Sequence, residues 1–166
     1  MRRSPSSGFI KSLMPTGFAW SAFLLRFFFG ILFFTAGWDK LTAEGGWSAA
    51  GYLSGATGPF AEFFQSMAGS VLIDQLNIWG LILIGVAFIL GAMVRPAAFF
   101  GIVLMLLYYF AAFESNIAHG LIDEHILYSF VFVLFITGGF GHVWGLDSIL
   151  ERRFEKSGTW TKWLFG

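Results

Sequence analysis

The sequence predicts an all-α integral membrane protein: a four-helix bundle with a short amphipathic outer helix between the first and second transmembrane helices. Two observations predict this fold class. Hydrophobic residues make up 57% of the 166 residues and charged residues only 12%, whereas a soluble domain carries about 25% charged residues. The apolar residues also gather into four runs, each long enough to cross about 30 Å of hydrocarbon as a helix. The four runs are Ala19–Trp38, Ile73–Val94, Ala97–Phe113 and Ile126–Val143.

The charged residues between the runs predict how the chain is oriented. Basic residues stand before the first run, at Arg95 between the second and third runs, and in the tail at 147–166. The two other connections are acidic, with Glu44 in the first and Asp123 in the second. Because basic connections stay in the cytoplasm, we expect one domain over residues 1–166 in the plasma membrane, with both termini cytoplasmic.

The long connection after the first run contains a second apolar pattern. Phe60, Phe63, Phe64 and Met67 recur at helical spacing, and a proline precedes them at a position suited to the first turn of a helix. We therefore expect an amphipathic helix at about 59–69 that lies on the outer membrane surface or caps the bundle. The alternative is a loop that only joins two helices.

Small residues within the runs predict close helix packing. The first run contains Gly30 and Gly37, and the second contains Gly85 and a small-xxx-small pair at Ala87 and Gly91. Such residues let helix backbones approach one another in a membrane. A cluster of glycines near the end of the fourth run is expected to loosen or end that helix. These four glycines are Gly138, Gly139, Gly141 and Gly145.

Arg26 is a charged residue inside the first run, about two turns from its start. An arginine at that depth costs a few kcal/mol or more unless it reaches the headgroups or finds a partner. We expect a structural role, either by such reaching or through an ion pair with Asp147. A contact with an anion, a sulfur oxyanion or a quinone is the alternative. Arg26 and the length of the run also argue against a cleaved signal peptide.

Polar residues at the outer end of the bundle form the candidate site. Antiparallel third and fourth helices joined by a short loop would bring their faces together into a pocket with an aromatic floor. Titratable side chains at the rim of such a pocket would suit a quinone headgroup, because the carbonyls of a quinone need hydrogen-bond donors and the reduction of a quinone needs protons. The alternative is that these are ordinary polar residues of loops. The candidate residues are Lys40, Glu114, Asn116, His119, His125 and Tyr128.

Other chemistries find little support in the sequence. The chain has no cysteine, which excludes a thiol relay, a cysteine nucleophile and a cysteine-ligated cluster within it. Its three histidines are not spaced as metal or haem ligands, and no flavin motif is evident. A formal net charge of zero argues against nucleic acid as a partner.

Several short motifs together resemble the DoxX-like family of small four-helix membrane proteins, over roughly Leu24 to Leu150. The first run carries an arginine, two glycines and a lysine, and the second ends in Arg-Pro-Ala. The fourth opens with Glu-His, closes with Gly-x-Gly and is followed by Gly-Leu-Asp. The family usually has a serine where this chain has Gly145. These motif residues are Arg26, Gly30, Gly37, Lys40, Arg95, Pro96, Ala97, Glu124, His125, Gly139, Gly141, Gly145, Leu146 and Asp147.

The resemblance implies a membrane subunit of an oxidoreductase that interacts with quinone and with a small sulfur oxyanion such as thiosulfate. It leaves open whether the chain is itself catalytic. The alternative is a non-catalytic membrane anchor or assembly subunit, and in either case we expect other protein subunits or further copies of the chain as partners. A small transporter has less support, because no inverted repeat or row of intramembrane charges is present.

Overall fold

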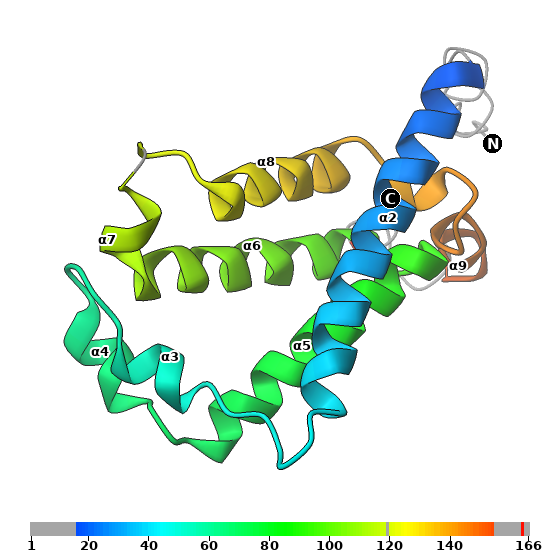
Figure 1. Ribbon diagram of the computed structural model, residues 1–166. Coiled ribbons are helices and arrows are strands. Elements are labelled where there is room, and N and C mark those ends of the chain that lie inside the picture. The colour runs from blue at the N-terminus through cyan, green and yellow to red at the C-terminus, as the bar shows by residue number, and fades with distance from the viewer. Residues whose placement is uncertain (1–15, 119, 155–163, 165–166) are drawn as a thin grey trace.

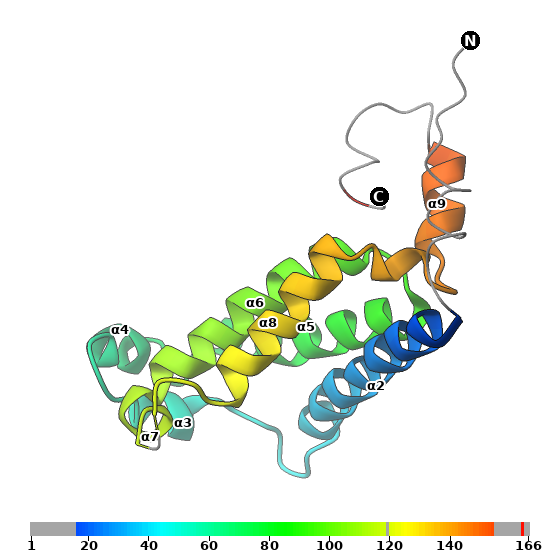
Figure 2. The same cartoon turned by 90° about the horizontal axis from the view of Figure 1, so that it is seen from above.

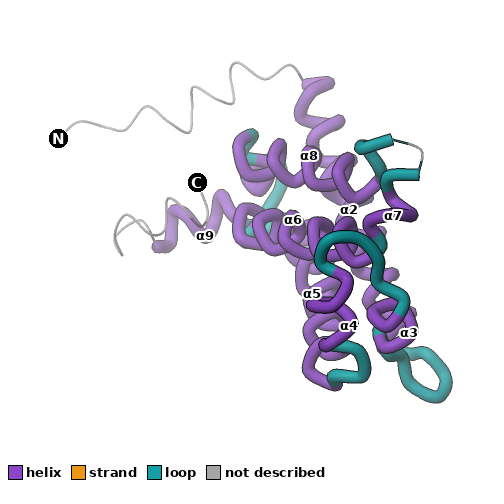
Figure 3. Tube along the Cα trace, turned by 90° about the vertical axis from the view of Figure 1, so that its left-hand side faces the viewer, coloured by secondary structure: helices purple, strands orange, loops and turns teal. Residues whose placement is uncertain are grey.

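The computed structural model describes residues 16–118, 120–154 and 164, and these residues form helices joined by loops (Figure 3). The all-helical prediction is confirmed for this part of the chain. Four longer helices run back and forth in sequence order (Figure 1). They are α2 (Thr16–Leu41), α5 (Val71–Leu90), α6 (Val94–Ala111) and α8 (Glu124–Thr137).

Short helices lie at the two ends of the longer ones (Figure 2). We call the end that carries α3 (Ala50–Ser54), α4 (Ala61–Ser66) and α7 (Phe113–Asn116) the α3–α4 end. The opposite end carries the 3₁₀ helix η1 (Phe140–His142) and α9 (Asp147–Phe154), and we call it the η1–α9 end. The residues Trp160 and Trp163, near the end of the predicted tail, lie outside the described residues.

Three of the four longer helices are long and apolar enough to cross a membrane, namely α2, α5 and α6. The fourth differs from the prediction of 126–143, because α8 has 14 residues and ends at Thr137. Its length of about 21 Å is short of the roughly 30 Å of hydrocarbon. Gly138 caps it and Gly139 takes a left-handed conformation with φ 62°, which a glycine adopts without strain. The orientation predicted from charge stays a prediction.

An aromatic core holds the four longer helices together. Phe33 of α2, Phe88 of α5, and Phe132 and Phe135 of α8 are each 3% exposed or less. The ring centroids of Phe33 and Phe132 lie 5.2 Å apart, and those of Phe88 and Phe135 lie 5.1 Å apart, the latter pair edge to face. Aromatic pairs in this geometry add attraction beyond the area they bury. The phenylalanine-rich composition therefore supplies the interhelical packing.

Helices α2 and α5 touch through their backbones, as the small residues predicted. A Cβ atom placed on Gly85 would lie 2.7 Å from the Cα atom of Phe34, and one placed on Gly37 would lie 2.9 Å from the backbone nitrogen of Ile82. Real Cβ contacts are essentially never below 3.0 Å. No side chain other than hydrogen fits at these two positions without a shift of one helix.

The predicted amphipathic helix at 59–69 is only partly helical, because α4 covers Ala61–Ser66. A second short helix, α3, precedes it, and the two bury a small apolar cluster that includes Leu53 and Phe64. The buried carboxylate of Asp74 accepts a hydrogen bond of 2.8 Å from the backbone N–H of Ala49. This bond ties the start of α3 to the first turn of α5.

We predict that Gly85→Ala destabilises the protein, while Gly80→Ala does not. The added methyl group at Gly85 would overlap Phe34 and push α2 from α5, at a cost of about 1–3 kcal/mol. Gly80 is on the same helix, and a Cβ there meets nothing within 4 Å. Thermal unfolding in detergent, followed by circular dichroism, would measure both. Equal midpoints for the two variants would contradict the backbone contact.

Candidate functional site

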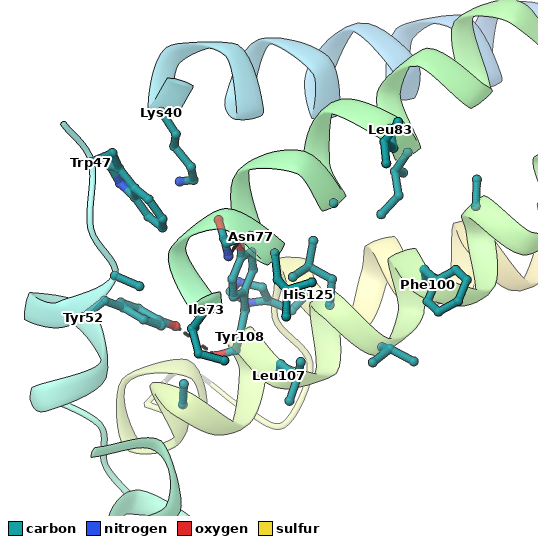
Figure 4. Close-up of a pocket in the computed structure, with 18 of the residues that line it drawn as sticks. Lys40, Trp47, Tyr52, Ile73, Asn77, Leu83, Phe100, Leu107, Tyr108 and His125 are labelled. Carbon is teal, nitrogen blue, oxygen red and sulfur yellow. Dashed lines mark hydrogen bonds between the residues drawn. The ribbon is translucent and has the colours of Figure 1, made fainter. Parts of the chain in front are cut away.

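A cavity of about 1140 Å³ lies between α5 and α6 (Figure 4). It begins at the α3–α4 end and extends along both helices toward the η1–α9 end, as far as Leu90 on α5 and Pro96 on α6. The cavity lies between these helices because α5 contacts α2 through its glycine face, while α6 packs mainly against α8. Most of its wall is aliphatic or aromatic, including Leu83, Phe100 and Leu104.

Polar side chains line one end of this cavity, near α3. We call this group the polar end, and Figure 4 shows its members converging from different segments of the chain. The segments are the last turn of α2, the loop before α3, α3 itself, the α5–α6 pair and the first turn of α8. The members are Lys40, Trp47, Tyr52, Asn77, Tyr108 and His125.

Tyr108 stands at the centre of the polar end. Its hydroxyl oxygen accepts a hydrogen bond of 2.5 Å from Nδ2 of Asn77. The hydroxyl of Tyr52 donates to the backbone oxygen of Tyr108 at 3.0 Å. Burial raises the pKa of Tyr52, and the negative charge of Asp123 raises it further, so Tyr52 stays a donor. Oδ1 of Asn77 is buried and accepts no hydrogen bond from any described residue.

His125 reaches the cavity from the first turn of α8 and is held by Asp123. Its Nδ1 lies 2.6 Å from Oδ2 of Asp123, and Oδ1 of Asp123 caps α8 by accepting from the N–H of Ile126 at 3.0 Å. Burial opposes the charge of Asp123, but the hydrogen bonds from His125 and Ile126 outweigh it and lower the pKa of Asp123. The imidazole also stands edge-on to the ring of Tyr108, with centroids 5.9 Å apart.

Lys40 closes the polar end on the side of α2. Its Nζ atom lies 4.4 Å from the ring centroid of Trp47, where the negative face of an indole attracts a cation. The contact holds the ammonium group at the edge of the cavity while leaving its N–H donors available. The polar end therefore offers a cation, a phenol, an amide and an imidazole to one ligand.

The structure separates the sequence-predicted site residues. Lys40 and His125 line the cavity, as expected of a common site. Asn116 donates instead to the backbone oxygen of Tyr109 at 2.9 Å, and Glu114 is exposed on α7. Tyr128 packs on Phe29 and Phe33 at the aromatic core rather than facing the cavity. His119 lies outside the described residues.

The pocket predicted between the third and fourth helices lies instead between α5 and α6. Helix α6 faces the cavity with Tyr108. The adjacent Tyr109 points elsewhere, and its hydroxyl donates to the backbone oxygen of Leu121. Sequence reasoning missed Asn77 and Tyr108. The signal was present for Asn77, since an amide within an apolar run is a polar group in lipid, the same reason that singled out Arg26.

The second candidate, Arg26 with Asp147, lies at the η1–α9 end. Arg26 is 0% exposed, and its guanidinium nitrogens form no hydrogen bond with any described residue. The carboxylate of Asp147 attracts this charge, but it accepts its hydrogen bonds from the backbone N–H groups of Met93 at 2.6 Å and Val94 at 3.1 Å. No direct ion pair of Arg26 and Asp147 is formed among the described residues. Asp147 therefore caps α6.

Comparison with known proteins identifies one family. A family model described as DoxX matches residues 21–114, a range that contains most of α2, all of α5 and α6, and five of the six members of the polar end. No curated protein and no solved structure matches the chain. Among the described residues, no three His, Asp or Glu side chains come together as a metal site requires.

We predict that Asp147→Ala destabilises the protein by about 1–3 kcal/mol, because two backbone N–H groups lose a buried acceptor. Glu151→Ala, on the same helix, removes the same charge but only the partly exposed contact with His142, which is worth about 0–1 kcal/mol. Chemical unfolding in mixed micelles would compare the two.

The Arg26→Leu background separates capping from ion pairing. If Asp147 acts by capping α6, Asp147→Ala costs nearly as much in that background as in the parent protein. A loss that disappears once Arg26 is gone would show that the attraction between the two charges is the main role of Asp147.

Proposed function

Because the chain belongs to the DoxX family, with the family model covering residues 21–114, we propose that it is a membrane subunit of an oxidoreductase that binds a lipophilic quinone. The quinone ring would sit at the polar end, and its tail would follow the apolar part of the cavity between α5 and α6. The observation that carries this proposal is the combination of both parts in one continuous cavity.

The apolar part of the cavity suits an isoprenoid tail in length and access. From Asn77 to Leu90 the wall follows α5 for about 20 Å. Its side chains are also exposed on the outside of the protein, with Leu83 at 62% and Phe100 at 61%. In a bilayer such side chains face lipid. A tail could therefore enter sideways from the membrane and leave its far end among the acyl chains.

The polar end suits the oxygens of the ring. The oxygen of Tyr108 accepts from Asn77, so its own proton is free to donate to a ring oxygen. Lys40 adds a charged donor at the edge of the cavity, and His125 adds a titratable group held by Asp123. A bound quinone supplies two-electron, two-proton chemistry, and these residues orient it and exchange its protons.

We further propose that the electron donor reaches the polar end from the α3–α4 end, which the predicted orientation places outside the plasma membrane. A small sulfur oxyanion such as thiosulfate fits the cation of Lys40, although the neighbouring acidic connections disfavour an anion. A partner subunit that covers the acidic connections would reduce their repulsion of the anion. A stable complex with partner proteins that retains no quinone would instead favour the anchor function.

We predict that Gly80→Phe lowers quinone retention at least tenfold. Gly80 lines the cavity one turn from Asn77, and open space lies in front of its missing side chain, so a phenyl ring would fill the ring site without disturbing the fold. Gly17→Phe is the matched control, because it also meets open space but lies outside the cavity. Organic extraction and mass spectrometry of the purified proteins would measure the bound quinone. Equal amounts of bound quinone in the two variants would contradict the proposal.

Tyr108→Phe tests the ring contact more finely. The change removes one hydroxyl and leaves the aromatic packing in place, so we expect quinone affinity to fall by about two- to tenfold, the usual range for one neutral hydrogen bond. Titration of the protein in nanodiscs with a short-chain quinone, followed by tryptophan fluorescence, would give the two dissociation constants. An unchanged dissociation constant would place the ring elsewhere in the cavity.

A further inference from the structure

We infer that the polar end selects the hydroquinone form of its ligand over the quinone form. This inference rests on the proposed function and adds a specificity to it. The two forms differ in hydrogen bonding, since a hydroquinone carries two O–H donors, whereas the carbonyl oxygens of a quinone only accept. A site that presents free acceptors to the ligand therefore favours the hydroquinone.

His125 is the first acceptor. The carboxylate of Asp123 has no proton to give, so the ring nitrogen beside it, Nδ1 at 2.6 Å, must carry the hydrogen. In the neutral imidazole the other nitrogen, Nε2, is then an acceptor with a free lone pair. With Nδ1 engaged, Nε2 is the nitrogen left for the cavity that His125 lines.

Asn77 supplies the second acceptor. Its Nδ2 donates to Tyr108, while its Oδ1 is buried and accepts from no described residue. A buried carbonyl oxygen without a donor is costly, and a turn of the Asn77 side chain toward the cavity that it lines would bring this oxygen to a ligand hydroxyl. A quinone has only acceptor oxygens. Bound at the polar end, it could donate no hydrogen bond to Oδ1 of Asn77 or to Nε2 of His125.

The other polar groups around His125 do not cancel this preference. Tyr108, Tyr52 and Lys40 face the same end of the cavity from α6, α3 and α2. Tyr52 already donates to a backbone oxygen. Tyr108 and Lys40 can donate to an oxygen of either form, because a hydroxyl oxygen also accepts. Only the acceptors distinguish the two forms.

Selective binding of the hydroquinone would have a consequence for electron transfer. A tenfold preference raises the midpoint potential of the bound two-electron couple by about 30 mV. The quinone at the site would then be a stronger oxidant than in the membrane. This direction suits a subunit that passes electrons to quinone.

The test is a comparison of dissociation constants for the oxidised and reduced forms of one short-chain quinone. The full-length protein would be titrated in nanodiscs, without oxygen, at pH about 8.5, where histidine is in general neutral. We expect the hydroquinone to bind about tenfold more tightly or better, since unsatisfied buried acceptors usually cost this much.

The decisive variant is Asp123→Asn, which should weaken the preference for hydroquinone, because only the acceptor of Asn77 remains. The cap of α8 needs an acceptor for the N–H of Ile126, and this holds the amide oxygen in place and turns the NH₂ group toward His125. Nδ1 must then accept, and the proton moves to Nε2, which becomes a donor. Asparagine caps helices as well as aspartate does, so the fold is kept.

Glu124→Gln is the matched control, because it removes the same charge from the same helix turn at an exposed position, and it should keep the parent preference. Nitrogen-15 NMR of labelled histidine would report the shift of the His125 proton from Nδ1 to Nε2 independently of any ligand. Equal affinities for both forms in the parent protein, or a preference for quinone, would overturn the inference while leaving quinone binding intact. Failure of both forms to bind would overturn the proposed function as well.

Discussion

The contact between the backbones of α2 and α5 is the constraint on which the rest of the structure depends. Where Gly37 and Gly85 meet the opposite helix, no side chain separates the two helices. In a membrane the hydrophobic effect does not drive helices together, so such close dispersion contacts matter more than in water. They join α2 and α5 into one unit. Helix α5 packs mainly against α2 and α6 mainly against α8, and the cavity lies between these two pairs.

Buried polar groups serve different purposes at the two ends of the protein. At the η1–α9 end, Asp147 satisfies backbone donors of the turn between α5 and α6, while the buried guanidinium of Arg26 forms no hydrogen bond with any described residue. At the α3–α4 end, Asn77 and His125 each keep a hydrogen-bonding atom that no described residue engages. The α3–α4 end is the better place for a ligand because Asn77 and His125 line the cavity, whereas Arg26 does not.

Much of the fold could be predicted from the sequence, because lipid restricts a spanning chain to a few solutions. The apolar runs located three candidate spans, and the glycines of α2 and α5 located their contact. The end of α8 was predicted only in part. The glycine cluster was expected to loosen or end the helix, and Gly138 and Gly139 do end it, but the predicted run continued to Val143.

The site was predicted less well, for a physical reason. Lys40 and His125 were recognised because charged and titratable residue types can be read directly from a sequence. Asn116 and Tyr109 were as polar as Asn77 and Tyr108, but their hydrogen bonds go to backbone oxygens of the fold. Which of two adjacent tyrosines faces a cavity depends on the rotation of α6 about its axis, and this is set by packing against α8.

The short length of α8 has a consequence for the surrounding bilayer. A helix of about 21 Å leaves roughly 9 Å of an ordinary hydrocarbon layer unmatched, and a bilayer answers such a mismatch by thinning. Leu121 and Ile122, 73% and 75% exposed, extend the apolar surface only slightly beyond the start of the helix. If α8 crosses the membrane, as the sequence predicts, the bilayer beside it would be thinner than beside α5 and α6. Water would then lie closer to the polar end, which His125 of α8 lines, than an unthinned bilayer allows.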